Sequence, residues 1–137
     1  MINLNFIYSE IFLALSIMTL LIVGVFKKNS STLIYNLSII SLLICLALIF
    51  NFPINENVEL FKNSYKIDYL SSFTKILLIS SGIFVLLLSN KYVQIIDINK
   101  IEYPILVLSS ILGMMVMVSS NDLILFYIGL ELQSLSL

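Results

Sequence analysis

Four apolar stretches, each long enough to cross a lipid bilayer, dominate this chain of 137 residues. They occupy about 7–26, 33–52, 69–89 and 101–118, and a fifth, shorter stretch occupies 122–137. A membrane-spanning helix needs about 20 predominantly apolar residues, and within lipid its backbone must satisfy its own hydrogen bonds. The sequence therefore predicts an all-α fold, a polytopic transmembrane helix bundle.

The composition supports the membrane class and narrows the possible functions. Hydrophobic residues make up 60% of the chain and charged residues 11%, with a mean hydropathy of +1.09. Histidine is absent, and the single cysteine, Cys45, lies inside an apolar stretch, so no metal-ligand spacing or disulfide framework is present. No basic patch indicates nucleic-acid binding. We expect the lipid bilayer as surroundings, no cofactor and no metal.

The lysines predict an orientation in the membrane. The connections after the first and third stretches hold Lys27, Lys28, Lys91 and Lys100, whereas the 53–68 connection holds only Lys62 and Lys66. Lysine-rich connections favour the cytoplasmic or matrix side of a membrane. We therefore expect the Lys27-Lys28 loop on that side and the N-terminus outside.

The fifth stretch contains one carboxylate in an apolar setting, Glu131. It lies nine residues after Asp122, or about 13 Å into a helix, close to the membrane midplane. An ionisable group at that depth is costly and indicates a function. Helical spacing places Tyr127 and Ser134 on the same face. We interpret Glu131 as a proton-handling carboxylate with Tyr127 and Ser134 as accessory groups; the alternative is a structural glutamate bonded to a neighbouring helix.

Lys75 lies about six residues inside the third apolar stretch. A lysine stem can extend from that depth to the interface, and this interpretation is preferred to an accessory role in proton transfer. Glu10 follows Ser9 near the start of the first stretch, where Ser9 as N-cap and Glu10 in the first turn would be ordinary helix-end electrostatics. Asp122 has the same structural interpretation at the start of the fifth stretch.

Two further features concern helix packing. Ser120 or Asn121 suits the N-cap of the fifth helix. Ser109 and Gly113 are four residues apart, a pair of small residues that lets another helix approach closely.

Residues 102–137, EYPILVLSSILGMMVMVSSNDLILFYIGLELQSLSL, closely resemble subunit 2 of NADH–ubiquinone oxidoreductase, the respiratory complex I. The positions that carry the resemblance are Glu102-Tyr103, Leu106, Ser109, Gly113-Met114, Met117, Ser119, Asp122-Leu123, Tyr127, Glu131-Leu132 and Ser134-Leu135. The first hundred residues fit more loosely, with SEIFLAL at 9–15 and Ser9 where the family commonly has proline.

The resemblance implies an antiporter-like membrane subunit that moves protons, while quinone reduction takes place elsewhere in the complex. Residues 1–100 would form three N-terminal transmembrane helices, and 101–137 the start of the first antiporter-like repeat. Glu131 matches the family's fifth-helix glutamate, whose lysine partner lies on a later helix. We expect this chain to be the N-terminal portion of a divided subunit, with a second polypeptide supplying that lysine and other complex I membrane subunits as partners.

The resemblance also implies an enzyme complex, although this chain carries no redox-centre motif. Many Ile, Asn, Lys, Phe and Tyr residues with few Ala and Gly are typical of AT-rich genomes, so we expect a mitochondrial inner membrane, with a bacterial plasma membrane as the alternative. Two other functions remain open: a fragment of a related cation/proton antiporter, and a non-catalytic membrane scaffold or assembly protein in which Glu131 only packs.

Overall fold

The computed structural model describes residues 7–26, 31–51, 58–60, 64–95 and 101–137, which form five helices and one β-hairpin. The elements are α1 (Tyr8–Phe26), α2 (Ser31–Asn51), β1 (Val58–Leu60), β2 (Tyr65–Ile67), α3 (Tyr69–Ile95), α4 (Glu102–Val118) and α5 (Leu123–Ser136). The five predicted apolar stretches all become helices, with ends that match closely except that α3 extends six residues further. The all-α prediction for the bundle is confirmed.

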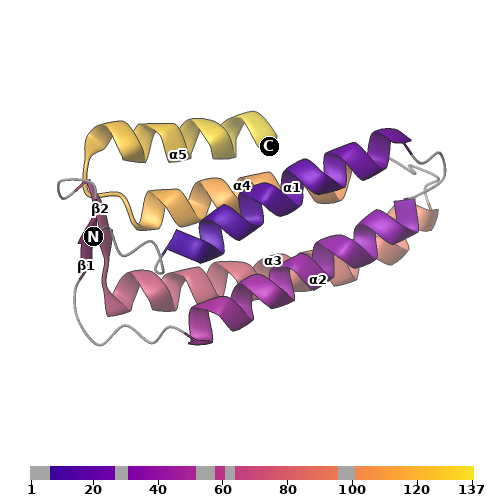
Figure 1. The fold of residues 1–137 in the computed structure, drawn as a ribbon. Helices are drawn as coiled ribbons and strands as arrows, with labels where there is room; N and C mark the ends of the chain where they lie inside the picture. The colour runs from indigo at the N-terminus through magenta and orange to yellow at the C-terminus, as the bar shows by residue number, and fades with distance from the viewer. Residues whose placement is uncertain (1–6, 27–30, 52–57, 61–63, 96–100) are drawn as a thin grey trace.

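The first four helices run antiparallel, one after the other, in a long bundle (Figure 1). α1 packs against α2 and α4, and α3 also packs against α2 and α4, so α1 and α3 lie diagonally across the bundle. α5 packs on the outer side of α4 and ends well short of the far end of the bundle. The hairpin lies at the end where α1, α3 and α5 begin (Figure 1).

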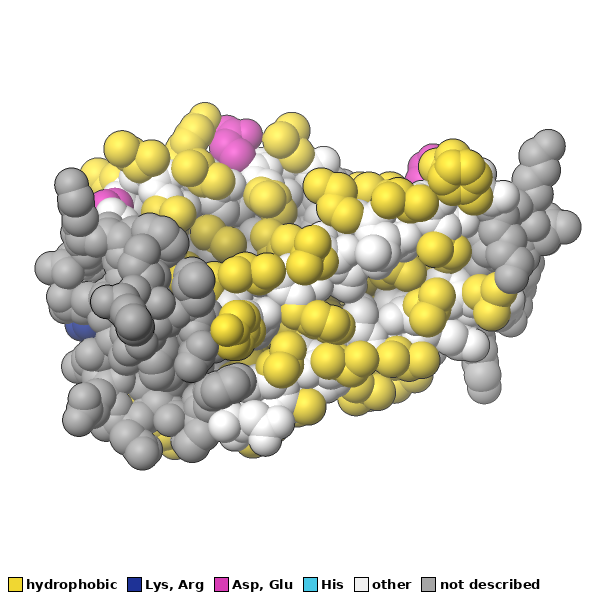
Figure 2. All heavy atoms as spheres, viewed as in Figure 1, with side chains coloured by type: hydrophobic (Ala, Val, Ile, Leu, Met, Phe, Trp, Pro, Cys, Tyr) yellow, Lys and Arg dark blue, Asp and Glu magenta, His cyan; other side chains and the backbone are white. Residues whose placement is uncertain are grey.

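The bundle has an apolar core and an apolar surface. Fully buried side chains from all four bundle helices fill its centre, including Leu13, Ile34, Leu42, Ile79, Leu86, Leu108 and Met115. Large hydrophobic side chains are also exposed on all five helices, and many lie along the helices on the face that Figure 2 shows. In water such a surface would be a liability, whereas in a bilayer it faces lipid tails.

Helix lengths agree with a membrane fold. Among the described residues, α1, α2 and the segment Tyr69–Asn90 of α3 are long and apolar enough to span a bilayer. α4 has 17 residues and α5 has 14, which correspond to about 25 Å and about 21 Å of helix. The fourth predicted span is thus at the lower limit of length, and α5 is shorter than a full crossing.

The β-hairpin was not predicted, because its two strands have only three residues each, too few to show an alternating pattern. Its strands pair antiparallel with Val58 opposite Ile67. β2 also bonds to the α4–α5 connection: the Lys66 amide donates to the Ser119 carbonyl (2.9 Å), and the Asn121 amide donates to the Ser64 carbonyl (2.8 Å). The hairpin is therefore attached to the start of α5.

Two glycines allow α4 and α5 to approach at backbone distance. A Cβ atom at Gly113 would lie 2.9 Å from the Gly129 carbonyl oxygen, and one at Gly129 would lie 2.9 Å from the Gly113 carbonyl oxygen. The predicted close approach at Gly113 is thus present, and its partner is Gly129. The Ser109 hydroxyl instead bonds to the Leu106 carbonyl within α4.

Gly129→Ala should weaken the α4–α5 contact, because the added methyl group meets backbone atoms that cannot move independently. We expect a loss of about 1–3 kcal/mol, the usual range for overpacking, measured as a lower midpoint of SDS-induced helix loss. Gly24→Ala is the matched control, since its methyl group meets side-chain atoms of Ile101 and Ile34 instead of backbone atoms. Equal midpoints for the two variants would contradict the close helix contact.

Candidate functional site

Three polar side chains from three different elements meet inside the hairpin end of the bundle. The Lys75 ammonium of α3 lies 2.5 Å from Glu10 Oε1 of α1 and donates to the Tyr65 hydroxyl of β2 at 3.1 Å. The Tyr65 hydroxyl donates to the same Glu10 oxygen at 2.6 Å. All three residues are buried, at 3%, 6% and 5% exposure for Lys75, Glu10 and Tyr65. We call these three residues the ion-pair cluster.

The remaining oxygen of Glu10 is also occupied. The Ser9 hydroxyl donates to Glu10 Oε2 at 2.8 Å, and the Ser9 carbonyl accepts from the Cys45 thiol of α2 at 3.5 Å. The Lys75 ammonium additionally lies 5.2 Å from the Tyr65 ring centroid, within cation–π range. Each charge in the cluster is therefore paired and hydrogen-bonded, as burial of an ion pair requires.

This arrangement corrects two sequence interpretations. Lys75 does not extend to the interface, since its side chain is buried and paired with Glu10. Glu10 is in the first turn of α1 as expected, but Ser9 lies within the helix, and the Glu10 carboxylate points to α3. The sequence did contain a signal for this pair. α1 and α3 start at the same end of the bundle, and near its start α1 carries an acidic residue and α3 a basic one. Tyr65 had no such signal.

The environment of Tyr65 keeps its phenol protonated. Burial raises the pKa of the Tyr65 hydroxyl above its usual value near 10, and the negative charge of Glu10 and the hydrogen bond to it raise this pKa further. The Ser119 hydroxyl faces the same phenol and acts in the opposite direction, lowering the pKa of Tyr65 by a smaller amount. A cavity of about 240 Å³ adjoins the cluster, lined by Ile7, Glu10, Ser64, Tyr65, Val116 and Leu125.

Glu131, the main predicted site residue, lies on α5, away from the ion-pair cluster. Its side chain is half-buried and lies beside that of Tyr127, one turn earlier on the helix. The Ser134 hydroxyl donates to the Glu131 carbonyl at 3.1 Å and not to its carboxylate.

The described ion pairs are Lys66–Asp68 and Lys75–Glu10, so Glu131 has no ion-pair partner within the described part of the chain. The structure thus joins Tyr127 to Glu131 but separates Lys75 and the Ser134 hydroxyl from the carboxylate.

Asp122 is the N-cap residue of α5, in place of the predicted Ser120 or Asn121. Its side chain makes no capping hydrogen bond and instead accepts one from the Ser64 hydroxyl beside β2. The start of α5 is therefore held by the hairpin through side-chain as well as backbone bonds.

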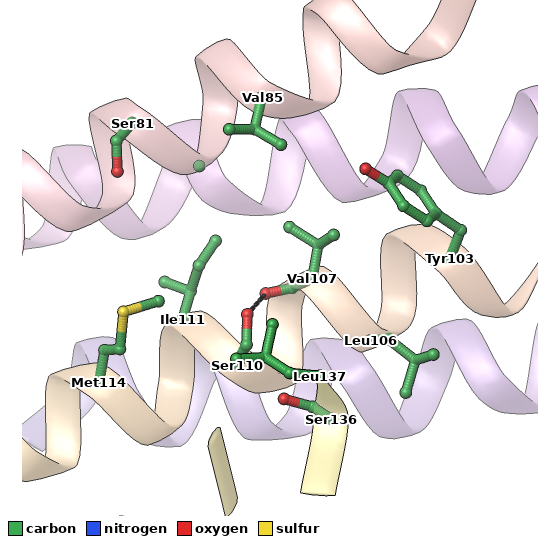
Figure 3. A pocket seen from close by; sticks show the side chains of 11 residues that line it. Ser81, Val85, Tyr103, Leu106, Val107, Ser110, Ile111, Met114, Ser136 and Leu137 are labelled. Carbon is green, nitrogen blue, oxygen red and sulfur yellow. Dashed lines mark hydrogen bonds between the residues drawn. The ribbon is translucent and has the colours of Figure 1, made fainter. Parts of the chain in front are cut away.

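An apolar groove of about 400 Å³ lies between α3, α4 and the last residues of α5 (Figure 3). Its polar groups include the Ser110 hydroxyl, which donates to the Val107 carbonyl at 2.8 Å and is thereby satisfied. The described residues contain no group of three or more potential metal ligands among Asp, Glu and Cys. The groove thus provides an apolar surface, while the ionisable side chains of the candidate site are those of the ion-pair cluster and Glu131.

The fold and these buried charges define a class of protein: a multi-pass membrane protein with ionisable groups inside its helix bundle. NADH-quinone oxidoreductase subunit N from Pelagibacter ubique is 62% identical over 135 residues, 98% of this chain. The subunits N from Maricaulis maris and Rhodospirillum rubrum are 39% and 41% identical over 98% and 93% of the chain. No protein-family profile matches the chain. The chain belongs to the family of NADH-quinone oxidoreductase subunit N, known as subunit 2 in complex I.

The match covers almost all of this chain but only part of each relative. The chain spans 29% of the Pelagibacter protein and 28% of the Maricaulis protein. The relatives are bacterial, so they give no support to the predicted mitochondrial membrane.

Single and double substitutions in the ion-pair cluster should distinguish the destabilisation caused by one unpaired charge from the net contribution of the pair to the free energy of unfolding. Glu10→Gln or Lys75→Met alone leaves one buried charge without its partner and should destabilise the bundle by about 3–5 kcal/mol. The double variant Glu10→Gln/Lys75→Met removes both charges, keeps a hydrogen-bond acceptor for Tyr65, and should be at least as stable as the wild type. SDS titration followed by far-UV circular dichroism measures all three, and additive losses would contradict a direct pair.

Stability should fall in alkaline solution because of Tyr65. Its raised pKa means that the folded chain keeps a proton that the unfolded chain loses above about pH 10. The contribution is complete below that pH and declines as pH rises toward the folded pKa. Tyr65→Phe has no proton to lose, so its stability should decline less steeply between pH 9 and pH 11 than that of the wild type, as measured by SDS titration at each pH. Equal slopes would count against a buried phenol.

Proposed function

We propose that this chain forms part of a proton-translocating membrane-arm subunit of NADH:quinone oxidoreductase, with Glu131 as its proton-handling carboxylate. The observation that carries the proposal is the 62% identity to a subunit N across 98% of the chain, a span that includes Glu131. We assign this chain to proton movement because Glu131 is an ionisable group within an apolar helix.

The geometry of α5 suits a carboxyl group that gains and loses a proton. Glu131 lies eight residues after Leu123, about 12 Å along the helix, among apolar side chains. Tyr127 can donate a hydrogen bond to the carboxylate and accept one from the protonated carboxyl group. A cation brought near Glu131 would favour the charged form, and its removal would favour the neutral form. We place that cation, a lysine, on another helix of the complex.

The partners and location follow from the same proposal. Other membrane subunits of complex I would cover the exposed face of α5, where Leu123, Ile124 and Leu135 are 87%, 77% and 82% exposed. The bacterial relatives favour a bacterial plasma membrane. The hairpin end, which holds the fewer lysines, would face outside, and the end holding Lys27 and Lys28 would face the cytoplasm.

Glu131→Gln tests this function directly. In inside-out membrane vesicles, NADH oxidation should continue while proton uptake per NADH falls several-fold, because the amide cannot bind and release a proton. Glu102→Gln is the matched control: it makes the same chemical change at an exposed position in the first turn of α4 and should leave proton uptake unchanged.

Two alternative functions give different results in the same vesicles. A scaffold or assembly protein predicts normal proton uptake with Glu131→Gln wherever the complex assembles. A cation/proton antiporter predicts ion-driven proton flux from this chain without NADH oxidation. Either result would contradict the proposal.

A further inference from the structure

We propose that Glu10 is a second proton-binding site, in which the carboxylate paired with Lys75 and bonded to Tyr65 takes up and releases one proton at the hairpin end of the bundle. The inference goes beyond the role proposed for Glu131, since it concerns different residues on α1, α3 and β2.

The position of the ion-pair cluster is the first argument. α1 and α3 lie diagonally across the four-helix bundle, so the Glu10–Lys75 bond crosses the bundle interior, where apolar side chains would otherwise meet. Glu10 is the third residue of α1 and Lys75 the seventh of α3, about 3 Å and about 9 Å from the helix starts. The pair is thus inside the bundle yet close to one membrane face.

The second argument is that packing alone does not require charges there. A buried ion pair is seldom more stabilising than apolar side chains of similar volume. Ionisable groups inside membrane helices are rare and mark proton or ion pathways. Close beneath these residues, buried aliphatic side chains such as Leu13 and Ile79 fill the same bundle interior.

The hydrogen bonds allow the proton to be exchanged locally. In the resting state Glu10 is a carboxylate, Lys75 an ammonium and Tyr65 a phenol, so the net charge is zero. A proton added to Glu10 gives a neutral carboxyl group and a net charge of +1, and its release restores the pair. Tyr65 serves both states, because its hydroxyl donates to the carboxylate and can accept from the carboxyl group.

The surroundings of the ion-pair cluster hold few groups that compete with Glu10 for the proton. The cavity of about 240 Å³ borders Glu10, Tyr65 and Ser64, and its accessible wall is apolar. The Ser119 hydroxyl faces Tyr65 from the α4–α5 connection. From α2 the cluster meets the Cys45 thiol, whose hydrogen bond goes to the Ser9 carbonyl. Among described residues, the charges in the cluster are those of Glu10 and Lys75.

Infrared difference spectroscopy on the chain, purified with the polypeptides that accompany it in the membrane, tests the proposal without NADH or quinone. Lowering the pH should produce, reversibly, the C=O stretching band of a newly protonated carboxyl group. This component should be absent from Glu10→Gln/Lys75→Met, which is expected to keep the fold, and present in Glu131→Gln. Tyr65→Phe should retain the component at a shifted frequency, because the carboxyl group loses one hydrogen bond.

A titrating band identical in the wild type and the double variant, at every pH where far-UV circular dichroism reports intact helices, would overturn the proposal. Glu10–Lys75 would then be a fixed structural pair. Lys75→Arg provides a second variant that keeps the positive charge and should retain the Glu10 component. Because Glu131→Gln is judged by proton uptake during NADH oxidation and Glu10 by its own band, either proposal can fail without the other.

Discussion

The salt bridge between Glu10 and Lys75 is the interaction on which the hairpin end of this bundle depends. It joins two helices that lie diagonally across the bundle, and the hydroxyl of Tyr65 bonds to both partners. Inside an apolar bundle each charge is costly without the other, so the pair favours the joint placement of α1, α3 and β2. A buried ion pair of this kind fixes the relative positions of the elements that carry it more than it stabilises the fold.

The hairpin extends this constraint to the start of α5. β2 contributes Tyr65 to the ion-pair cluster. The residues on either side of Tyr65, Ser64 and Lys66, form hydrogen bonds with the connection between α4 and α5. From that fixed start, Gly113 and Gly129 hold α5 against α4 at backbone distance. The position of Glu131 relative to α4 therefore follows from contacts made at the hairpin end and at the two glycines.

The sequence predicted most of the fold because membrane helices are encoded locally. Long apolar stretches specify their own helices, and the ends of α1, α2 and α4 came within two residues of the predicted positions. It also found Gly113 as a point of close approach and grouped Tyr127 with Glu131 by helical spacing. It did not find the hairpin, whose three-residue strands carry no periodic signal, and it favoured a structural helix-end role for Glu10 and an interfacial position for Lys75.

By itself, then, the sequence determined the membrane class, the helices, the family and the presence of costly charges in apolar stretches, since each depends on residues close together along the chain. Only the tertiary structure decided which charges meet. Glu10 and Lys75 are 65 positions apart and Tyr65 lies on a third element, so their contact depends on how α1, α3 and β2 are placed. The same packing separates Lys75 from Glu131, because helices that start at one end of a bundle can still lie on different sides of it.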